Sequence, residues 1–278
     1  MKCRAYAKVN LGLDVASKRE DGYHELKSVM VPIQLHDLIE INVSEEMHFE
    51  CVPNFLIHPD KNTLHKMIEV CRDKFKFTEN FTIRLFKHIP SQAGLGGGSS
   101  DGAAILNYLD RYFNWKLSDQ EKIDLAVQVG ADVPFCLFEK PALVTGIGEK
   151  LEFFENHTSF WMVLVQPRKG VSTKKAFEGL DIPNLVHPDI DRIKDTLSNN
   201  QYHSFINAID NSLEAKAITL VPEIKLLKEL LVDLGCDRSM MTGSGSVVIG
   251  FSQSEAVIDE CIKSLRKQVR FVRKTKIL

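Results

Sequence analysis

Apolar and polar residues alternate near the start of the chain, and this alternation predicts a strand over residues 6–15. Val9 and Leu11 fall on one side of the strand, whereas Lys8 and Asn10 fall on the other. A lysine and an asparagine on one face are unusual in a strand that serves structure alone. Similar patterns predict the remaining strands, at residues 29–35, 38–43, 81–86, 143–147, 160–166, 247–251 and 271–277.

Apolar residues at helical spacing predict the helices, at residues 62–75, 102–112, 118–128, 188–197, 202–209, 221–234 and 254–267. Ser118, with Glu121 three residues later, has the capping-box pattern of a helix start. Strands and helices follow one another without a regular βαβ repeat. The pattern therefore predicts an α+β fold, which we divide into two domains at residues 1–158 and 159–278.

Composition narrows the class of protein. The chain has 278 residues, 44% of them apolar, which is enough for a sizeable core. A net charge of −2, with no dense basic stripe outside residues 266–276, argues against a nucleic-acid partner. The six cysteines include no CxxC pair, so a zinc ribbon is not expected. The N-terminus is polar and no apolar run reaches membrane-spanning length, so we expect a cytoplasmic protein without a membrane partner.

A glycine-rich stretch from Gly94 to Ser100 is the most informative feature of the sequence. Such a density of glycine suits backbone that adopts positive φ or approaches a ligand closely. The stretch follows a predicted strand and precedes a predicted helix, which Ser99, Ser100 or Asp101 could cap. Free N–H groups and the dipole at a helix start favour phosphate. We therefore predict a phosphate-binding loop; the alternative is a flexible linker.

Three known phosphate motifs do not fit this loop. A Walker A loop ends in Gly-Lys-Ser/Thr, and no lysine lies between Lys87 and Lys116. In the dinucleotide fingerprint the third glycine would be Ser99 or Asp101, depending on the starting glycine. The H-R-D and D-F-G motifs of protein kinases do not occur in the chain. The loop therefore belongs to another class of phosphate site.

Asp132 and Lys8 are candidates for the chemistry at such a site. Asp132 lies between Gly130 and Pro134, on a short connection that restricts it. A carboxylate there can deprotonate a hydroxyl that attacks a γ-phosphoryl group. A lysine nearby, for which Lys8 is the candidate, would keep the carboxylate ionised. From the residues alone, a turn aspartate and a surface lysine are the simpler alternatives.

Together these motifs carry a resemblance that runs nearly from end to end. With residues 5–11, 21–24, 90–100, 130–134 and 242–245 in this order and at compatible spacing, the chain resembles the GHMP small-molecule kinases. The resemblance implies the two-domain GHMP kinase fold, with an active-site cleft between the domains. It also implies ATP and Mg²⁺ as cofactors, with metal ligands that we do not assign. We expect a monomer or a weak homodimer.

The resemblance also assigns roles to residues. Asp132 would be the catalytic base and Lys8 would stabilise charge beside it. The ATP phosphates would lie over the loop made of Pro90, Ser91, Gln92, Ala93, Gly94, Leu95, Gly96, Gly97, Gly98, Ser99 and Ser100. Relatives more often have apolar and glycine residues at 91–93, and Ala93 restricts φ, which puts the conformation at the start of the loop in doubt.

Within the family, the chain is similar to the branch whose substrate bears a cytidine diphosphate group and leads to isoprenoids. Asn10 would contact the alcohol part of that substrate, and Tyr23 and His24 would recognise the cytosine. Phe177 would form a second wall around the base, or it is a core residue of a short helix. Tyr23 and His24 could instead be a surface pair at a turn. The turn at residues 243–245 would shape the cleft, or it is a tight connection between strands.

Two other functions stay open. The first is another GHMP kinase, acting on mevalonate, homoserine or a sugar. The segment Asp21–His24, which a cytidine-bearing substrate would explain, argues against it. The second is a catalytically silent nucleotide-binding protein on the same fold, and the presence of both Lys8 and Asp132 argues against that.

Overall fold

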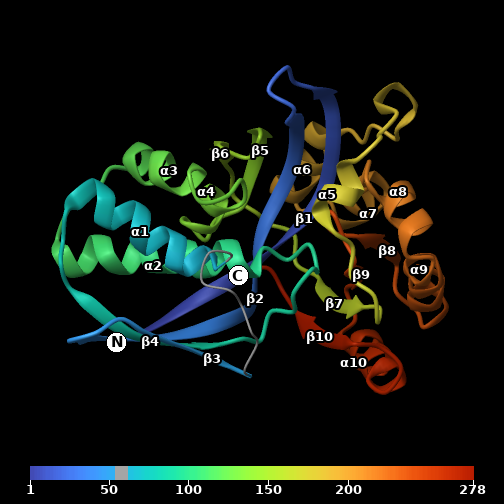
Figure 1. Cartoon of the computed structure of the whole chain (residues 1–278). Coiled ribbons are helices and arrows are strands. Elements are labelled where there is room, and N and C mark those ends of the chain that lie inside the picture. Colours follow the sequence, from blue (N-terminus) through green and yellow to red (C-terminus); the bar gives the residue numbers. More distant parts are fainter. Residues whose placement is uncertain (54–61) are drawn as a thin grey trace. The chain divides into compact units, whose positions relative to one another are not determined.

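A computed structural model describes residues 1–53 and 62–278 of the chain (Figure 1). The chain forms two compact units. The first unit consists of Met1–Lys8, Leu35–Pro90 and Gly96–Glu139, and the second of Val9–Gln34, Ser91–Leu95 and Lys140–Leu278. Neither unit is one continuous segment, because the chain passes from one to the other more than once. The division at residue 158 that the sequence pattern predicts stays a prediction.

Two long strands, β1 (Lys2–Lys18) and β2 (His24–Ser44), pair with each other and contribute to both units. β2 is continuous where the sequence predicts two strands, because the polar residues Gln34, His36 and Asp37 interrupt its apolar pattern. One of these, Asp37, is nevertheless fully buried. Its carboxylate accepts hydrogen bonds from the backbone N–H groups of His88 and Ile89, so a polar residue satisfies the backbone here without ending the strand.

The first unit packs helices on one face of a sheet (Figure 1). Strand β4 (Asn80–Phe86) pairs antiparallel with residues 38–44 of β2 and parallel with β3 (His48–Val52). The helices are α1 (Thr63–Phe75), α2 (Gly97–Phe113), α3 (Asp119–Val127) and α4 (Val133–Cys136). Ile41 and Ile83 from the strands share one core with Met67 of α1 and Leu106 of α2. The predicted capping box of Ser118 and Glu121 is present at the start of α3.

The second unit contains a four-stranded antiparallel sheet in the order β10-β7-β9-β8. Its strands are β7 (Trp161–Gln166), β8 (Arg238–Met241), β9 (Val248–Ser252) and β10 (Phe271–Thr275), and the unit also holds β5 (Ala142–Gly146) and β6 (Lys150–Phe153). Its helices are α5 (Thr173–Phe177), the 3₁₀ turn η2 (Ile182–Asn184), α6 (Ile190–Ser198), α7 (Tyr202–Ala208), α8 (Glu214–Leu220), α9 (Glu223–Asp233) and α10 (Glu255–Leu265). Helices α9 and α10 pack against this sheet.

Mixed strands and helices in this order confirm the predicted α+β class. The sequence pattern did not predict β3, β6, β8, α4 or α8, which are short, whereas the short helix that was one of two alternatives for Phe177 is present as α5. A helix of one or two turns, or a strand of four or five residues, has too few positions to show its hydrophobic period. In the described parts of the chain, no helix has the length and apolar composition that crossing a bilayer requires.

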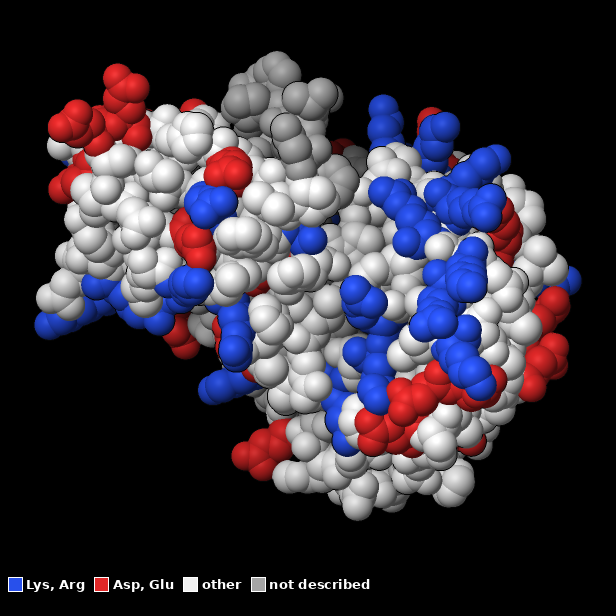
Figure 2. Space-filling view, turned by 90° about the horizontal axis from the view of Figure 1, so that it is seen from below, with Lys and Arg blue, Asp and Glu red and all other residues white. Residues whose placement is uncertain are grey.

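The basic stretch near the C-terminus has partners within the second unit. Lys274 Nζ lies 2.7 Å from a carboxylate oxygen of Glu255 and 2.6 Å from one of Asp259. The ammonium of Lys276 lies 3.6 Å from the ring centroid of Trp161. Figure 2 shows lysine and arginine side chains gathered on part of one face, with acidic side chains beside them. Two lysines of the stretch, Lys274 and Lys276, therefore have acidic or aromatic neighbours in their own chain.

Candidate active site

Lys8 and Asp132, far apart in the sequence, form an ion pair in the first unit. Lys8 Nζ lies 3.2 Å from Oδ2 of Asp132, and the lysine side chain is 4% exposed whereas the aspartate side chain is 37% exposed. Gly96 makes room for the lysine, because a Cβ there would lie 2.9 Å from Lys8 Cγ. A buried ammonium beside a carboxylate that reaches solvent can stabilise an alkoxide that develops there. The alternative that Lys8 is a surface lysine is therefore wrong.

Asp132 is placed by a short helix that the sequence did not reveal. It occupies the N-cap position of α4, with Pro134 in the first turn. The backbone N–H of Val133 donates to the carbonyl of Gly130, 3.1 Å away, and closes the turn before the helix. Proline fixes its own φ and restricts the residue before it, so the backbone here has little freedom. The turn therefore restrains the backbone that carries Asp132, while the ion pair with Lys8 orients its carboxylate.

The glycine-rich stretch forms the first turn of α2, which begins at Gly97 and not at Gly102 as predicted. The N-cap is Gly96, with φ of 68°, and no side chain caps the helix, so the prediction that Ser99, Ser100 or Asp101 is the cap is wrong. The N–H of Ser100 donates to the carbonyl of Gly96 at 2.8 Å. The N–H groups before it have no acceptor within an α-helix. This arrangement suits an anion.

A second reason for glycine at the start of α2 is close packing. A Cβ at Gly97 would lie 2.9 Å from Ile89 Cγ2 and 3.3 Å from the ammonium of Lys87. A Cβ at Gly98 would lie 2.8 Å from the hydroxyl oxygen of Thr63. The helix start therefore lies directly on the segment that precedes the loop and on the start of α1.

Lys87 is a cation that the sequence analysis did not assign. Its ammonium pairs with the buried carboxylates of Asp37 and Asp101, the latter at 2.8 Å. Burial lowers the pKa of Lys87, but the two carboxylates outweigh burial and leave it raised. Burial raises the pKa of Asp101 to about 8, against the effect of Lys87. A lysine two residues before the Ile89-Pro90 pair would have been the sequence clue, since its ammonium lies beneath Gly97.

The start of the loop belongs to the second unit and contains a strained residue. Gln92 has φ of 53°, a left-handed conformation that costs energy for any residue with a Cβ. Its carbonyl accepts from the N–H of Ser246 at 3.3 Å, and Gln166 Nε2 donates to the carbonyl of Ser91 at 2.9 Å. Gln92 is therefore the left-handed residue in residues 91–93, the segment whose conformation the sequence left in doubt.

The turn at Thr242–Gly245, between β8 and β9, lies against Gly94. Gly94 has φ of +76°, and a Cβ there would lie 2.3 Å from the carbonyl oxygen of Thr242. Gly243 has φ of +58°, and a Cβ there would lie 3.0 Å from the carbonyl oxygen of Gly94. Two glycines face each other because neither position has room for a side chain. The second glycine-rich turn therefore supports the loop.

Asn10 is buried in the second unit and connects β1 to this turn. Its backbone N–H donates to the hydroxyl of Thr242 at 2.8 Å. Its side-chain Nδ2 donates to the hydroxyl of Ser28 at 2.8 Å, and that hydroxyl donates to the carbonyl of Gly12 at 2.6 Å. These contacts fix the orientation of the carboxamide, which lies two residues from Lys8 on the same strand.

His24 and Phe177 come together in the second unit. Their ring centroids are 5.1 Å apart, with 35° between the ring planes. Burial lowers the pKa of His24, and the charge of Lys18 lowers it further, so the imidazole is neutral at pH 7. A neutral imidazole offers one donor and one acceptor. Tyr23 is 58% exposed, and its backbone N–H donates to Asp21 Oδ1 at 3.0 Å.

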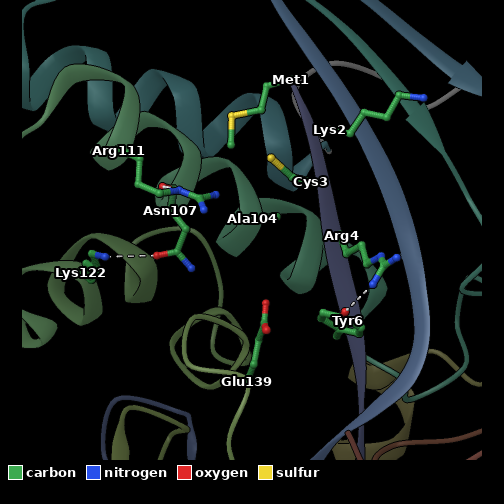
Figure 3. Close-up of a pocket in the computed structure, with 10 residues that line it drawn as sticks. All are labelled: Met1, Lys2, Cys3, Arg4, Tyr6, Ala104, Asn107, Arg111, Lys122 and Glu139. Carbon is green, nitrogen blue, oxygen red and sulfur yellow. Dashed lines mark hydrogen bonds between the residues drawn. The ribbon is translucent and has the colours of Figure 1, made fainter.

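A cavity of about 520 Å³ lies elsewhere in the first unit (Figure 3). The start of β1 and one face of α2 line it with α3 and Glu139; its residues are Met1, Lys2, Cys3, Arg4, Tyr6, Ala104, Asn107, Arg111, Lys122 and Glu139. Lys8 and Asp132 are not among them. Both lysines that line the cavity have partners in the chain. Lys122 Nζ lies 2.8 Å from a carboxylate oxygen of Asp110, and Lys2 Nζ lies 2.8 Å from one of Glu40.

Comparison with known proteins identifies the family. Residues 62–140 match the GHMP kinases N terminal domain, and residues 181–270 match the GHMP kinases C terminal domain. A 4-diphosphocytidyl-2-C-methyl-D-erythritol kinase from Clostridium beijerinckii is 35% identical over 274 residues, covering 98% of both chains. A protein of the same name from Bacillus cytotoxicus is 34% identical, covering 95% of this chain and 92% of its own.

Solved structures agree with this. A crystal structure of 4-(cytidine 5'-diphospho)-2C-methyl-D-erythritol kinase is 28% identical, with a TM-score of 0.84, and covers 100% of this chain and 99% of its own. Homoserine kinase from Cytophaga hutchinsonii, at 17% identity and a TM-score of 0.75, shares the fold. The motifs, the fold and the relatives lead to one conclusion: the chain belongs to the GHMP kinases.

Proposed function

We propose that this chain transfers the γ-phosphoryl group of ATP to the 2-hydroxyl of 4-diphosphocytidyl-2-C-methyl-D-erythritol, in isoprenoid biosynthesis. The observation that carries the chemistry is the Lys8–Asp132 pair, with a buried ammonium 3.2 Å from a carboxylate that reaches solvent. The names of the full-length relatives support the substrate. Homoserine and mevalonate kinases share the fold at identities too low to indicate their substrates.

In this proposal the start of α2 binds the phosphates of ATP. The N–H groups of Gly97, Gly98 and Ser99 face away from the helix body, and the helix dipole favours negative charge there. The ammonium of Lys87 lies beneath Gly97, where the carboxyl groups of Asp37 and Asp101 balance its charge. Because backbone groups do most of the binding, the loop needs no lysine of the Walker type.

Asp132 then acts as the general base. It takes the proton of the substrate hydroxyl as that oxygen forms a bond to the γ-phosphorus, and the bond from phosphorus to the β-phosphate oxygen breaks. ADP leaves with the electrons of that bond, and Asp132 passes the proton to solvent. Lys8 stabilises the negative charge on the attacking oxygen and favours the ionised carboxylate. Positioning and charge compensation, not covalent chemistry, lower the barrier.

Mg²⁺ would neutralise phosphate charge when ATP is bound, as GHMP kinases use ATP with this metal. The residues fit that role, because Mg²⁺ on nucleotides keeps most of its waters and needs few protein ligands. In the described parts of the chain, no cluster of three or more His, Cys, Asp or Glu side chains could hold a metal without the nucleotide. Ser100 Oγ donates to the carbonyl of Tyr6 at 2.6 Å, so Ser99 is the better candidate for a hydroxyl ligand.

The cytidine end of the substrate would be recognised in the second unit. His24 and Phe177 offer ring surfaces for stacking, and the neutral imidazole can pair with the edge of the base. Tyr23 is exposed, so its ring is accessible to a ligand. Asn10 would contact the alcohol part of the substrate, through the carboxamide that Ser28 orients. A cytoplasmic location and a monomeric or weakly dimeric state stay predictions.

The test is ADP release with the full-length protein, ATP and Mg²⁺ against four acceptors: the cytidyl alcohol, mevalonate, homoserine and galactose. Turnover with the cytidyl alcohol alone is expected, whereas turnover with mevalonate alone would overturn the substrate. Lys8→Met tests the chemistry, with Lys122→Met as its control. Lys122 is also a shielded lysine paired with an aspartate in the first unit, but its partner is Asp110. Lys8→Met should lower kcat about a hundredfold or more, whereas Lys122→Met should leave kcat unchanged.

A further inference from the structure

Two side chains from a distant part of the sequence hold the turn between β8 and β9. Asn211 Nδ2 donates to the carbonyl oxygens of Met241 at 2.8 Å and of Gly243 at 2.9 Å. The carboxylate of Glu214 accepts from the N–H of Met241 at 2.7 Å. Asn211 is 2% exposed and Glu214 8% exposed. The backbone at both ends of Thr242 is therefore fixed by groups that solvent does not reach.

The carboxamide of Asn211 has only one workable orientation. Both hydrogen atoms of its amide are used on carbonyl oxygens, and its Oδ1 accepts from the N–H of Leu213 at 2.9 Å. The backbone around it is bonded to β1, since Leu13 donates to the carbonyl of Asp210 and accepts from the N–H of Ser212. Asn211 therefore transmits the position of β1 to the turn.

The turn in its place contacts two candidate binding residues. The carbonyl oxygen of Thr242 lies so close to Gly94 that a Cβ there would come within 2.3 Å of it. The hydroxyl of Thr242 accepts from the N–H of Asn10 at 2.8 Å. A shift of the turn would therefore move or release both the phosphate loop at Gly94 and the strand at Asn10.

We propose that Asn211 and Glu214 are positioning residues of the kinase: they fix the β8–β9 turn so that the loop at Gly94 and the carboxamide of Asn10 keep the geometry that ATP and the alcohol need. This inference rests on the proposed function. Neither side chain is expected to touch a substrate. Both act through the backbone of residues 241–243, which they hold by hydrogen bonds.

Ser212 offers a matched control. It is adjacent to Asn211 and is also 2% exposed. Its hydroxyl donates to the carbonyl of Val186 at 2.7 Å and to Oδ1 of Asp14 at 3.1 Å, and it accepts from the N–H of Val15 at 3.3 Å, whereas the bonds to Met241 and Gly243 described above come from Asn211 and Glu214. Ser212→Ala therefore removes buried hydrogen bonds without releasing the turn. Glu214→Gln is the conservative variant, because a glutamine carbonyl can still accept from the N–H of Met241. Glu214→Ala cannot replace that bond.

The experiment measures kcat, KM for ATP and the melting temperature of the full-length variants, at a temperature where each is folded. Asn211→Ala and Glu214→Ala should lower kcat/KM for ATP about tenfold to a hundredfold, as small displacements of reacting groups do. Ser212→Ala and Glu214→Gln should stay near wild type in kcat/KM, even where the melting temperature falls. If Asn211→Ala and Ser212→Ala melt lower together and both keep wild-type kinetics, the role is structural only and the proposal is wrong.

Two further measurements distinguish a failure of this positioning role from a failure of the proposed kinase function. Absence of wild-type turnover with the cytidyl alcohol would refute the proposed substrate. The equilibrium affinity for a fluorescent ATP analogue, which needs no turnover, would then decide whether Asn211→Ala weakens binding relative to Ser212→Ala. Should Asn211→Ala not fold, the Glu214 pair decides: a defect in Glu214→Ala that Glu214→Gln lacks supports positioning, and equal values overturn it.

Discussion

Gly94 is the position where one added methyl group should disturb the phosphate loop most directly. In Gly94→Ala the new Cβ would lie 2.3 Å from the carbonyl oxygen of Thr242 and 3.2 Å from the N–H nitrogen of Gly245. Atoms in van der Waals contact stand about 3.5 Å apart, so the loop or the turn must move by about 1 Å. Both are backbone, and neither can turn away as the end of a long side chain could.

The expected magnitude has two parts. Placing alanine at φ of +76° costs about 1–2 kcal/mol, because left-handed backbone is unfavourable with a Cβ. Overpacking adds about 1–3 kcal/mol, so the free energy of unfolding should fall by about 2–5 kcal/mol in total. Gly179→Ala is the matched control, since its φ is +66° and nothing lies within 4 Å of a Cβ there. Gly179→Ala should lose only the about 1–2 kcal/mol that left-handed backbone costs.

The assay is equilibrium unfolding in urea, followed by KM for ATP in the folded variants. Because both variants change glycine to alanine, the effect on the entropy of the unfolded chain cancels in the comparison. Gly94→Ala should lose more stability than Gly179→Ala and should also raise KM for ATP. Equal losses of stability in the two variants, with unchanged KM, would refute the argument that Gly94 is glycine because of Thr242.

Three further predictions concern the charged and aromatic groups. Asp132→Asn should lower kcat by about 10²–10⁴-fold, as loss of a general base does, while the equilibrium affinity for ATP stays near wild type; near-normal turnover would remove Asp132 from this role. His24→Ala should raise KM for the cytidyl substrate about 5- to 150-fold, from the loss of about 1–3 kcal/mol of stacking, with kcat little changed; an unchanged KM would exclude His24 from the pocket. Burial raises the pKa of Asp101 from its ordinary 3.8 to about 8, so the unfolded chain gives up this proton at lower pH than the folded one. The contribution of Asp101 to the free energy of unfolding is therefore greatest below about pH 4 and declines as the pH rises towards 8. The free energy of unfolding of Asp101→Asn, measured across this range, should decline less than that of wild type. Identical pH profiles would refute the raised pKa of Asp101.

The sequence predicted the class of fold and the longer elements well, because strands such as β4 and helices such as α1 repeat their period several times. The sequence-based prediction failed where close backbone packing, and not the pattern of side chains, decides the structure, as at the start of α2. Gly97 and Gly98 discourage a helix by their intrinsic preference, yet they lie in the first turn of α2 because Ile89 and Thr63 leave no room for larger residues. Tertiary packing overrides propensity at that point.

The sequence could predict which residues form the candidate site only where those residues belong to motifs. The sequence could name Lys8 and Asp132 but not their distance, because a contact between residues so far apart depends on the whole first unit. Asn211 gave no clue, since its role lies in hydrogen bonds to carbonyl groups that any sequence at 241–243 would provide. Lys87 was missed for a similar reason: Asp37, which holds it, comes from the part of β2 that the sequence pattern leaves out.

The way the chain passes between its two units limits how this enzyme could be rebuilt. The first segment of one unit ends at Lys8, and the other unit begins at Val9. A cut there would split β1 between Lys8, which pairs with the candidate base Asp132, and Asn10. Exchanging one whole unit with that of a relative would therefore break a continuous strand. Residues 19–23 offer a better place for grafting, because the N–H of Arg19 donates to the carbonyl of Tyr23 at 2.8 Å and closes that loop on itself. Exchange of this hairpin would therefore leave β1 continuous, whereas recombination of the two units would not.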